Sequence, residues 1–135
     1  VQNVSEDAIN LHLDYGSRLP TELCTMHLYP INGAVHNVGR NDTAFSYRDV
    51  TFVQVIVGVD GDPANVDPMT QWARDYWSAL HPYSAGGAYV NMMMEEGQGR
   101  VRDAYRDNYP RLAAIKAQVD PGNLFHINQN IEPRS

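Results

Sequence analysis

The alternation of hydrophobic and polar positions predicts several strands in the first half of the chain. Residues 51–59 are β-branched and almost wholly apolar, and the turn residues 60–63 follow them. Such a strand is expected to be covered by helices on one face or on both. Residues 21–29 alternate more evenly and predict a second strand, with residues 34–38 as its hairpin partner. Alternation over residues 11–15 predicts a further short strand.

Helical spacing begins after this strand-rich part. Asp67 can cap a helix that has Pro68 in its first turn and that ends near His81. Its apolar stripe repeats at intervals of three and four residues. The stripe consists of Met69, Trp72, Ala73, Tyr76, Trp77 and Leu80. Because strands come first and helices later, the order predicts an α+β fold with helices covering an antiparallel sheet.

The last third of the chain predicts one more strand and two helices. The apolar residues 88–93 are expected to form a strand that carries Tyr89 and Asn91 on one face. A helical stretch follows and is interrupted at Pro110, and residues 120–123 end the second helix.

Composition narrows the range of functions. The chain has 135 residues, and ten Lys and Arg face sixteen Asp and Glu, which gives a formal net charge of -6. This balance argues against partners with dense negative charge, namely nucleic acids and anionic membrane surfaces. No apolar run approaches the ~20 residues of a membrane span. Cys24 is the only cysteine and the five histidines lack ligand spacing, so neither a disulfide nor a metal site is expected.

The start of the chain adds an expectation about processing. Residues 1–10 are polar and lack the apolar region of a signal peptide, so this segment leaves the localisation undetermined. The first residue is Val rather than Met, which suggests a processed product or a fragment.

Three segments combine residues that could carry chemistry. In residues 82–91, a pair of glycines precedes Tyr89 and Asn91, whose phenol and carboxamide could hydrogen-bond a planar heterocycle or a substrate hydroxyl. Ordinary packing of a strand after a loop is the alternative. In residues 120–131, three adjacent amides must find partners if they are buried. In residues 43–49, an arginine and an aspartate could form a surface ion pair.

In this order, the segments resemble the C-terminal region of the berberine-bridge-enzyme-like FAD-linked oxidases, members of the vanillyl-alcohol-oxidase superfamily. The resemblance runs from about residue 33 to residue 133. It rests on residues 43–49, 72–84, 87–91, 100–116 and 120–131. It implies a flavoprotein in which a substrate domain places an antiparallel sheet, backed by helices, over the flavin ring. Residues 1–93 would then supply the sheet and its covering helix. Residues 94–135 would form the C-terminal helical segment that returns toward the FAD domain.

The resemblance also implies roles for individual residues. Asn91 would face the flavin or the substrate, with Tyr89 beside it, and both are candidate cofactor-binding residues. Asn128 and Asn130 would lie near the FAD-domain boundary and are further cofactor-binding candidates. Gln54 lies on a strand that runs beneath the substrate in relatives, so Gln54 and Asn91 are the expected substrate-binding residues.

The catalytic base departs from the family pattern. Many relatives have a tyrosine directly after the motif asparagine, and this chain has Met92, which cannot accept a proton. The candidates for the base are therefore Tyr89, Tyr47 and His27, although a phenol is a poor base until neighbours lower its pKa.

These observations favour one function over two alternatives. The chain is expected to be the C-terminal part of an FAD-dependent oxidase. That oxidase would take a hydride from a small alcohol, sugar, amine or secondary metabolite, with oxygen as the acceptor. The chain alone would be inactive and would need an FAD-binding domain or polypeptide as its partner. The alternatives are a stand-alone, non-enzymatic domain that binds a small ligand, and a homo-oligomer. Exposed apolar surface would distinguish the oxidase part from the stand-alone domain.

Overall fold

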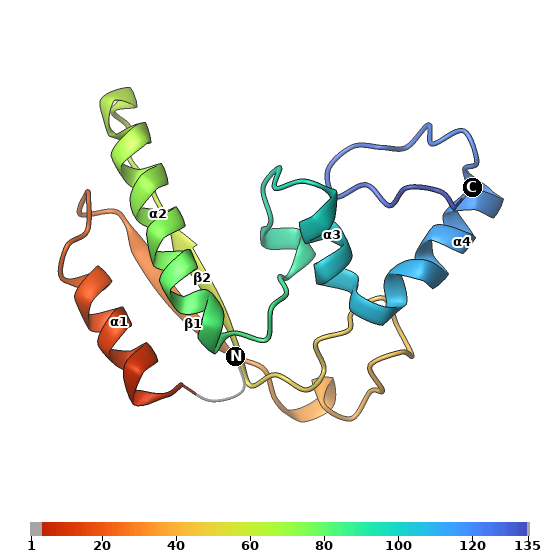
Figure 1. Cartoon of the computed structure of the whole chain (residues 1–135), viewed down its shortest axis with the longest axis horizontal. Helices are drawn as coiled ribbons and strands as arrows, with labels where there is room; N and C mark the ends of the chain where they lie inside the picture. Colours follow the sequence, from red (N-terminus) through yellow and green to blue (C-terminus); the bar gives the residue numbers. More distant parts are fainter. Residues whose placement is uncertain (1–3, 135) are drawn as a thin grey trace. The chain divides into compact units, whose positions relative to one another are not determined.

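The computed structural model describes residues 4–134 (Figure 1), and their contacts divide the chain into two compact units. Unit 1 comprises the residues up to Ile31 together with Val50–Gly86, and unit 2 comprises Asn32–Asp49 and the residues from Gly87 onward. Each unit therefore combines segments that are distant in sequence. The assignment of residues 1–93 and 94–135 to different roles remains a prediction.

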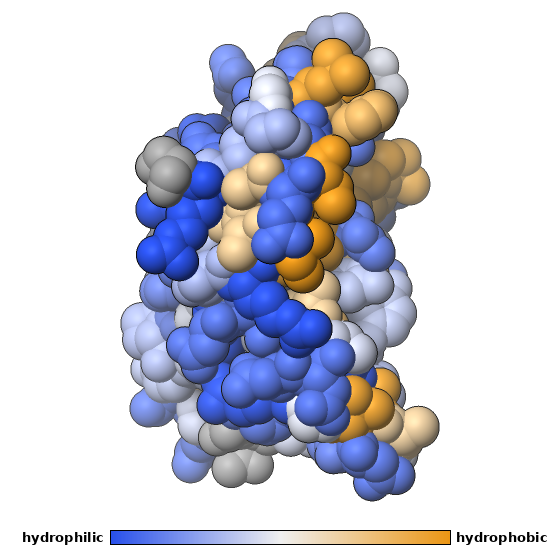
Figure 2. Space-filling model, turned by 90° about the vertical axis from the view of Figure 1, so that its right-hand side faces the viewer, coloured by the Kyte–Doolittle hydropathy of each residue, from blue (hydrophilic) through white to orange (hydrophobic). Residues whose placement is uncertain are grey.

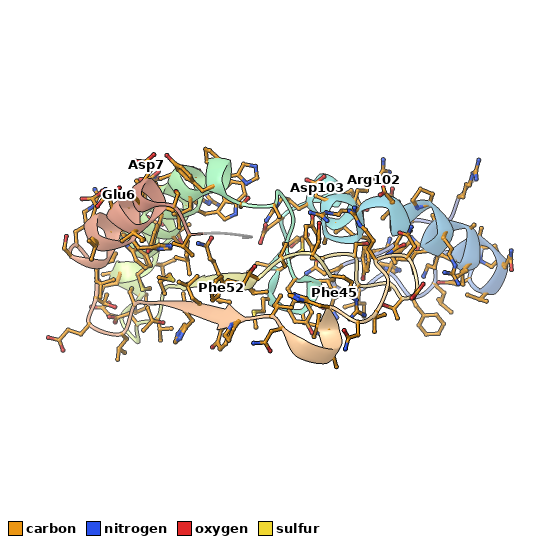
Figure 3. All side chains as sticks on the ribbon, turned by 90° about the horizontal axis from the view of Figure 1, so that it is seen from below. Glu6, Asp7, Phe45, Phe52, Arg102 and Asp103 are labelled. Carbon is orange, nitrogen blue, oxygen red and sulfur yellow. The ribbon has the colours of Figure 1, made fainter. Side chains whose placement is uncertain are left out.

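Unit 1 begins with a helix where the sequence predicted a strand. Helix α1 spans Glu6–Gly16, and the Ser5 hydroxyl accepts a hydrogen bond from the Ala8 N–H at 3.2 Å. Glu6 and Asp7 lie in its first turn, where negative charge complements the helix dipole (Figure 3). The prediction of a strand over residues 11–15 is wrong. Alternation there coincides with helical spacing, which places Ala8, Leu11 and Tyr15 against the core.

The sheet of unit 1 is a pair of antiparallel strands. Strand β1 spans Thr25–Pro30 and pairs with β2, Phe52–Val57, so two of the predicted strands are confirmed. The expected hairpin partner at residues 34–38 is wrong. Residues Gly33–Val35 form the short 3₁₀ turn η1, and Gly33 has a φ of 60°, which turns the chain away from an extended path.

Helices cover one face of this sheet. Helix α2 spans Val66–Leu80 after the 3₁₀ turn η2 (Pro63–Asn65), and the turn η3 (His81–Tyr83) follows it. Met26 and Ile56 are paired neighbours in the register and pack against the core that the helices form. The buried residues of that core are Ala8, Cys24, Met69, Trp72, Tyr76 and Leu80. Figure 3 shows α1 and α2 on the same side of the two strands, which confirms the predicted α+β arrangement.

Unit 2 is built from short helices and ordered loops. Helix α3 spans Gln98–Tyr105 and α4 spans Tyr109–Val119, and the 3₁₀ turn η5 (Arg106–Asn108) separates them. Residues 88–93 do not form the predicted strand. Val90–Met92 is the 3₁₀ turn η4, because a short apolar run fits either conformation and no strand of unit 2 is there to pair with it among the described residues.

A small hydrophobic core holds unit 2 together. Met93, Val101 and Ala104 are buried in it, and Ala88 and Tyr109 pack against them. Within residues 4–134, no helix combines the length and the apolar character that crossing a membrane requires.

Candidate functional site

The predicted pair Tyr89 and Asn91 meets in unit 2. Asn91 Nδ2 donates a hydrogen bond of 3.0 Å to the Tyr89 hydroxyl, and the ring of Phe45 packs edge-to-face on the Tyr89 ring at 6.0 Å. Both side chains are on the surface, and Tyr89 is 37% exposed. The 3₁₀ turn η4, rather than the predicted strand, brings the two together. Because the Tyr89 oxygen accepts from Asn91, its own proton remains available for donation outward.

A close contact fixes the loop that leads to this pair. A Cβ at Gly87 would lie 1.5 Å from the Tyr47 hydroxyl oxygen, so only glycine allows the backbone this near to the ring. Tyr47 is 7% exposed, and its hydroxyl donates to the Asp103 carbonyl at 2.6 Å. Arg106 stacks on the Tyr47 ring, with its guanidinium carbon 3.7 Å from the ring centre. Tyr47, a predicted base, thus has a packing role, and its catalytic role remains a prediction.

The amide-rich tail, residues 120–131, is hydrogen-bonded to the segment that follows Tyr89 and Asn91 in unit 2. Gln129 Nε2 donates to the carbonyls of Met93 and Met94 at 2.9 and 3.3 Å, directly after η4. The structure therefore joins two motifs that are separate in the sequence. Asn128 lies at the surface with a φ of 62°, a left-handed conformation that asparagine tolerates better than most residues. Asn130 is half-buried next to it.

An acidic side chain shapes the start of this tail. Asp120 accepts backbone hydrogen bonds from Leu124 and Phe125 at 2.8 and 3.1 Å, and it forms an ion pair with Lys116. Lys116 also donates to the Phe125 carbonyl at 2.6 Å. The hydrogen bond from Lys116, supported by the two backbone N–H groups, lowers the pKa of the Asp120 carboxyl. The tail is thus held in a defined conformation although its hydrophobic side chains point outward.

Gln54 and His27 belong to unit 1 and lie on opposite faces of the sheet. Gln54 shares the helix-covered face with Ile56, and its Nε2 atom lies 3.2 Å from His12 Nε2. His27 is exposed on the other face, bonded to Thr25 at 3.0 Å and stacked on Tyr29. The predicted substrate-binding role of Gln54 and the predicted basic role of His27 remain predictions.

A histidine that the sequence analysis did not single out lies at the centre of a hydrogen-bonded chain. His12 Nδ1 lies 2.6 Å from the Tyr76 hydroxyl, opposite the contact with Gln54. A neutral imidazole fits both contacts, since it accepts from the Gln54 amide and donates to the phenol. Burial lowers the pKa of His12 and raises the pKa of Tyr76 to about 12. The strand expected at residues 11–15 concealed this role.

We expect the stability of unit 1 to decrease in weak acid because of His12. The folded state disfavours its charged form, so unfolding takes up a proton as the pH falls below the ordinary pKa of about 6.5. The contribution is complete above that pH and is lost progressively toward the lowered pKa of the folded state. Urea unfolding of the wild type and of His12→Gln at about pH 7.5 and about pH 5 measures the difference. The exposed His126→Gln is the control, and an equal acid loss in wild type and His12→Gln would refute the assignment.

No group of three or more metal-ligating side chains occurs among residues 4–134. The candidate site around Tyr89 and Asn91 consists of neutral hydrogen-bonding groups, chiefly a phenol and carboxamides.

Comparison with known proteins gives a consistent set of relatives. Residues 88–132 match the family model described as "Berberine and berberine like". An FAD-linked oxidoreductase of Bacillus subtilis (strain 168), YgaK, is 28% identical over 96% of this chain and 29% of its own length. The FAD-linked oxidoreductase sorD of Penicillium rubens is 30% identical over 85% of this chain and 25% of its own length.

A solved structure shows the same likeness in three dimensions. The BBE-like 1 protein of Physcomitrella patens superposes with a TM-score of 0.70 at 25% identity, over 82% of this chain and 23% of the other. The chain thus spans 29% of the length of YgaK and 25% of the length of sorD.

Proposed function

From the homology of this chain to the berberine-bridge-enzyme-like FAD-linked oxidoreductases, we propose that it is the substrate-side and C-terminal part of such an enzyme. The complete enzyme would oxidise a small alcohol, sugar, amine or secondary metabolite, with oxygen as the electron acceptor. An FAD-binding domain or polypeptide would complete it. This is supported by the fact that the chain spans only 29% and 25% of the length of two FAD-linked relatives.

The observation that carries this proposal is the Tyr89–Asn91 pair within the matched segment. Asn91 holds the phenol oxygen of Tyr89 at a fixed position, and the phenol proton is directed away from Asn91. Such a group can orient a substrate hydroxyl or amine, or exchange a proton with it. Met92 beside the pair cannot do so. Of the two candidate tyrosines, Tyr47 is buried and bonded to the Asp103 carbonyl, whereas Tyr89 is exposed and positioned by Asn91 within the matched segment.

Exposed hydrophobic side chains on unit 2 support the proposal that a partner domain or polypeptide covers this surface. On the tail of unit 2, Leu124, Phe125 and Ile127 are 74%, 77% and 82% exposed. Figure 2 looks onto the side of unit 2 that carries α4 and shows hydrophobic residues there among hydrophilic ones. Since the Asp120 contacts hold the tail in place, this exposure belongs to an ordered surface. An ordered apolar surface is typical of a protein interface.

The residues of unit 2 fit FAD chemically. The buried side-chain oxygen of Asn130 has no hydrogen-bond partner among the described residues, and a flavin offers N–H and O–H donors. Asn130 would therefore hold the cofactor from this side, and Asn91, Tyr89 and Asn128 remain candidates that the resemblance implies. Bound FAD would supply the hydride acceptor. The chain's own contribution is to orient the substrate through Tyr89 and to exclude water from the site.

The test uses the complete protein, with flavin reduction followed by visible absorbance after anaerobic mixing with alcohols, sugars and amines. We expect Tyr89→Phe to lower the reduction rate about 100-fold, the range of a lost acid–base group, without changing the flavin content. Tyr83→Phe is the matched control, because Tyr83 has the same 37% exposure. Equal rates in both variants would refute the role of Tyr89. A complete protein that holds no flavin would refute the function.

A further inference from the structure

Three buried acceptors in unit 2 lack hydrogen-bond partners among the described residues, namely Gln98 Oε1, Asn123 Oδ1 and Asn130 Oδ1. Two of them belong to residues that are joined by a hydrogen bond. Gln98, the first residue of α3, donates from Nε2 to the Asn130 carbonyl at 3.2 Å. The remaining oxygens of these side chains, Gln98 Oε1 and Asn130 Oδ1, are both buried and have no partner among the described residues. A buried acceptor without a donor is costly in a folded protein, so two on linked residues require an explanation.

Neither residue is loosely held. The Asn130 N–H donates to the Asn128 carbonyl at 2.9 Å, and the neighbouring Gln129 is anchored on the Met93 and Met94 carbonyls. Gln98 is fixed by its helix and by its bond to the tail. With the Asn130 backbone and the Gln98 side chain held in this way, a group from outside the chain can supply the missing donors.

We propose that Gln98 and Asn130 together form a subsite that accepts hydrogen bonds from donor groups of FAD, with Gln98 as a further cofactor-binding residue. This inference rests on the proposed function. Two neutral carboxamide oxygens select uncharged N–H or O–H donors rather than phosphate. FAD carries such donors in its flavin imide, its ribityl and ribose hydroxyls and its adenine amine. The subsite explains why both oxygens are left free although Gln98 Nε2 and the backbone N–H and carbonyl of Asn130 are bonded.

The proposal predicts effects of opposite sign with and without FAD. Gln98→Met and Asn130→Leu keep the side-chain size and remove the free acceptor. In the FAD-free protein both variants remove an unsatisfied buried oxygen, so Asn130→Leu should raise the melting temperature by about 3 °C. Gln98→Met also loses the donor to the Asn130 carbonyl, so its melting temperature should rise less. With FAD the same variants lose a hydrogen bond, so each should weaken FAD binding by about fivefold. A purely structural role would not reverse the sign in this way.

The experiment titrates FAD into the FAD-free complete protein, follows flavin fluorescence, and measures melting in parallel. Gln71→Met is the control, since Gln71 is exposed on α2 and its side chain donates to Asp75 at the surface. Unchanged FAD affinity in both variants would overturn the subsite while leaving the proposed function intact. Unchanged FAD affinity with weakened association of the FAD-binding polypeptide would also overturn it, in favour of a protein contact. Failure of the wild type to bind FAD would refute the proposed function itself.

Discussion

Replacing Gly87 with alanine is expected to destabilise unit 2 by more than about 3 kcal/mol, the upper range for forcing atoms into a packed site. The added Cβ would lie 1.5 Å from Tyr47 Oη and 1.7 Å from Cζ. The ring cannot move aside easily, because its hydroxyl is bonded to the Asp103 carbonyl and Arg106 stacks on it. Urea unfolding of wild type and Gly87→Ala, followed by circular dichroism, measures the loss.

The control for this substitution lies in the same unit. Gly99 is an exposed residue of α3, and a Cβ there would meet nothing within 4 Å. Gly99→Ala should therefore stabilise by up to about 1 kcal/mol through helix propensity. If Gly87→Ala unfolds at the same urea concentration as Gly99→Ala, the close contact does not exist in solution.

The second large effect is expected at Asn108, which is 5% exposed at the start of α4. Its Nδ2 atom lies 2.8 and 2.9 Å from the carbonyl oxygens of Arg40 and Thr43, and 2.7 Å from the Ser46 hydroxyl. Asn108→Asp keeps the size of the side chain and replaces the donor with a carboxylate oxygen. At neutral pH it should destabilise by about 3 kcal/mol, because buried carbonyls lose their donor and face a negative charge.

Two comparisons make the Asn108 prediction specific. Asn37→Asp makes the same chemical change at an exposed position and should change the unfolding free energy by less than about 0.5 kcal/mol. Lowering the pH toward about 4 should restore part of the stability of Asn108→Asp, since a protonated carboxyl can donate again. A loss that does not depend on pH would argue that Asn108 acts through its shape alone.

The sequence predicted the parts of the fold that depend on local pattern. The β-branched run around Ile56 and the apolar stripe from Met69 to Leu80 each had one consistent interpretation, and β2 and α2 confirm them. The pattern at residues 11–15 is compatible with a strand and with a helix. The helix α1 forms because it packs against the core of unit 1. Residues 88–93 lacked a strand to pair with, which only the tertiary structure reveals.

The candidate site could be predicted only in part, for a similar reason. Tyr89 and Asn91 are close in sequence, so their proximity could be anticipated even from the wrong secondary structure. Gln98 depends on the carbonyl of Asn130, 32 positions later in the chain, and no local pattern marks it. The adjacent amides at residues 128–130 did signal that buried partners were needed. They could not show that one acceptor would remain free.

We propose that this chain completes an FAD-linked oxidoreductase. The most direct measurement compares the FAD-binding polypeptide with and without this chain. It follows the visible absorbance of the flavin after anaerobic addition of whichever alcohol, sugar or amine reduces the flavin of the complete protein. We predict that the substrate reduces the flavin only when the chain is present, and that Tyr89→Phe slows this reduction. Reduction at the same rate without the chain would contradict the account.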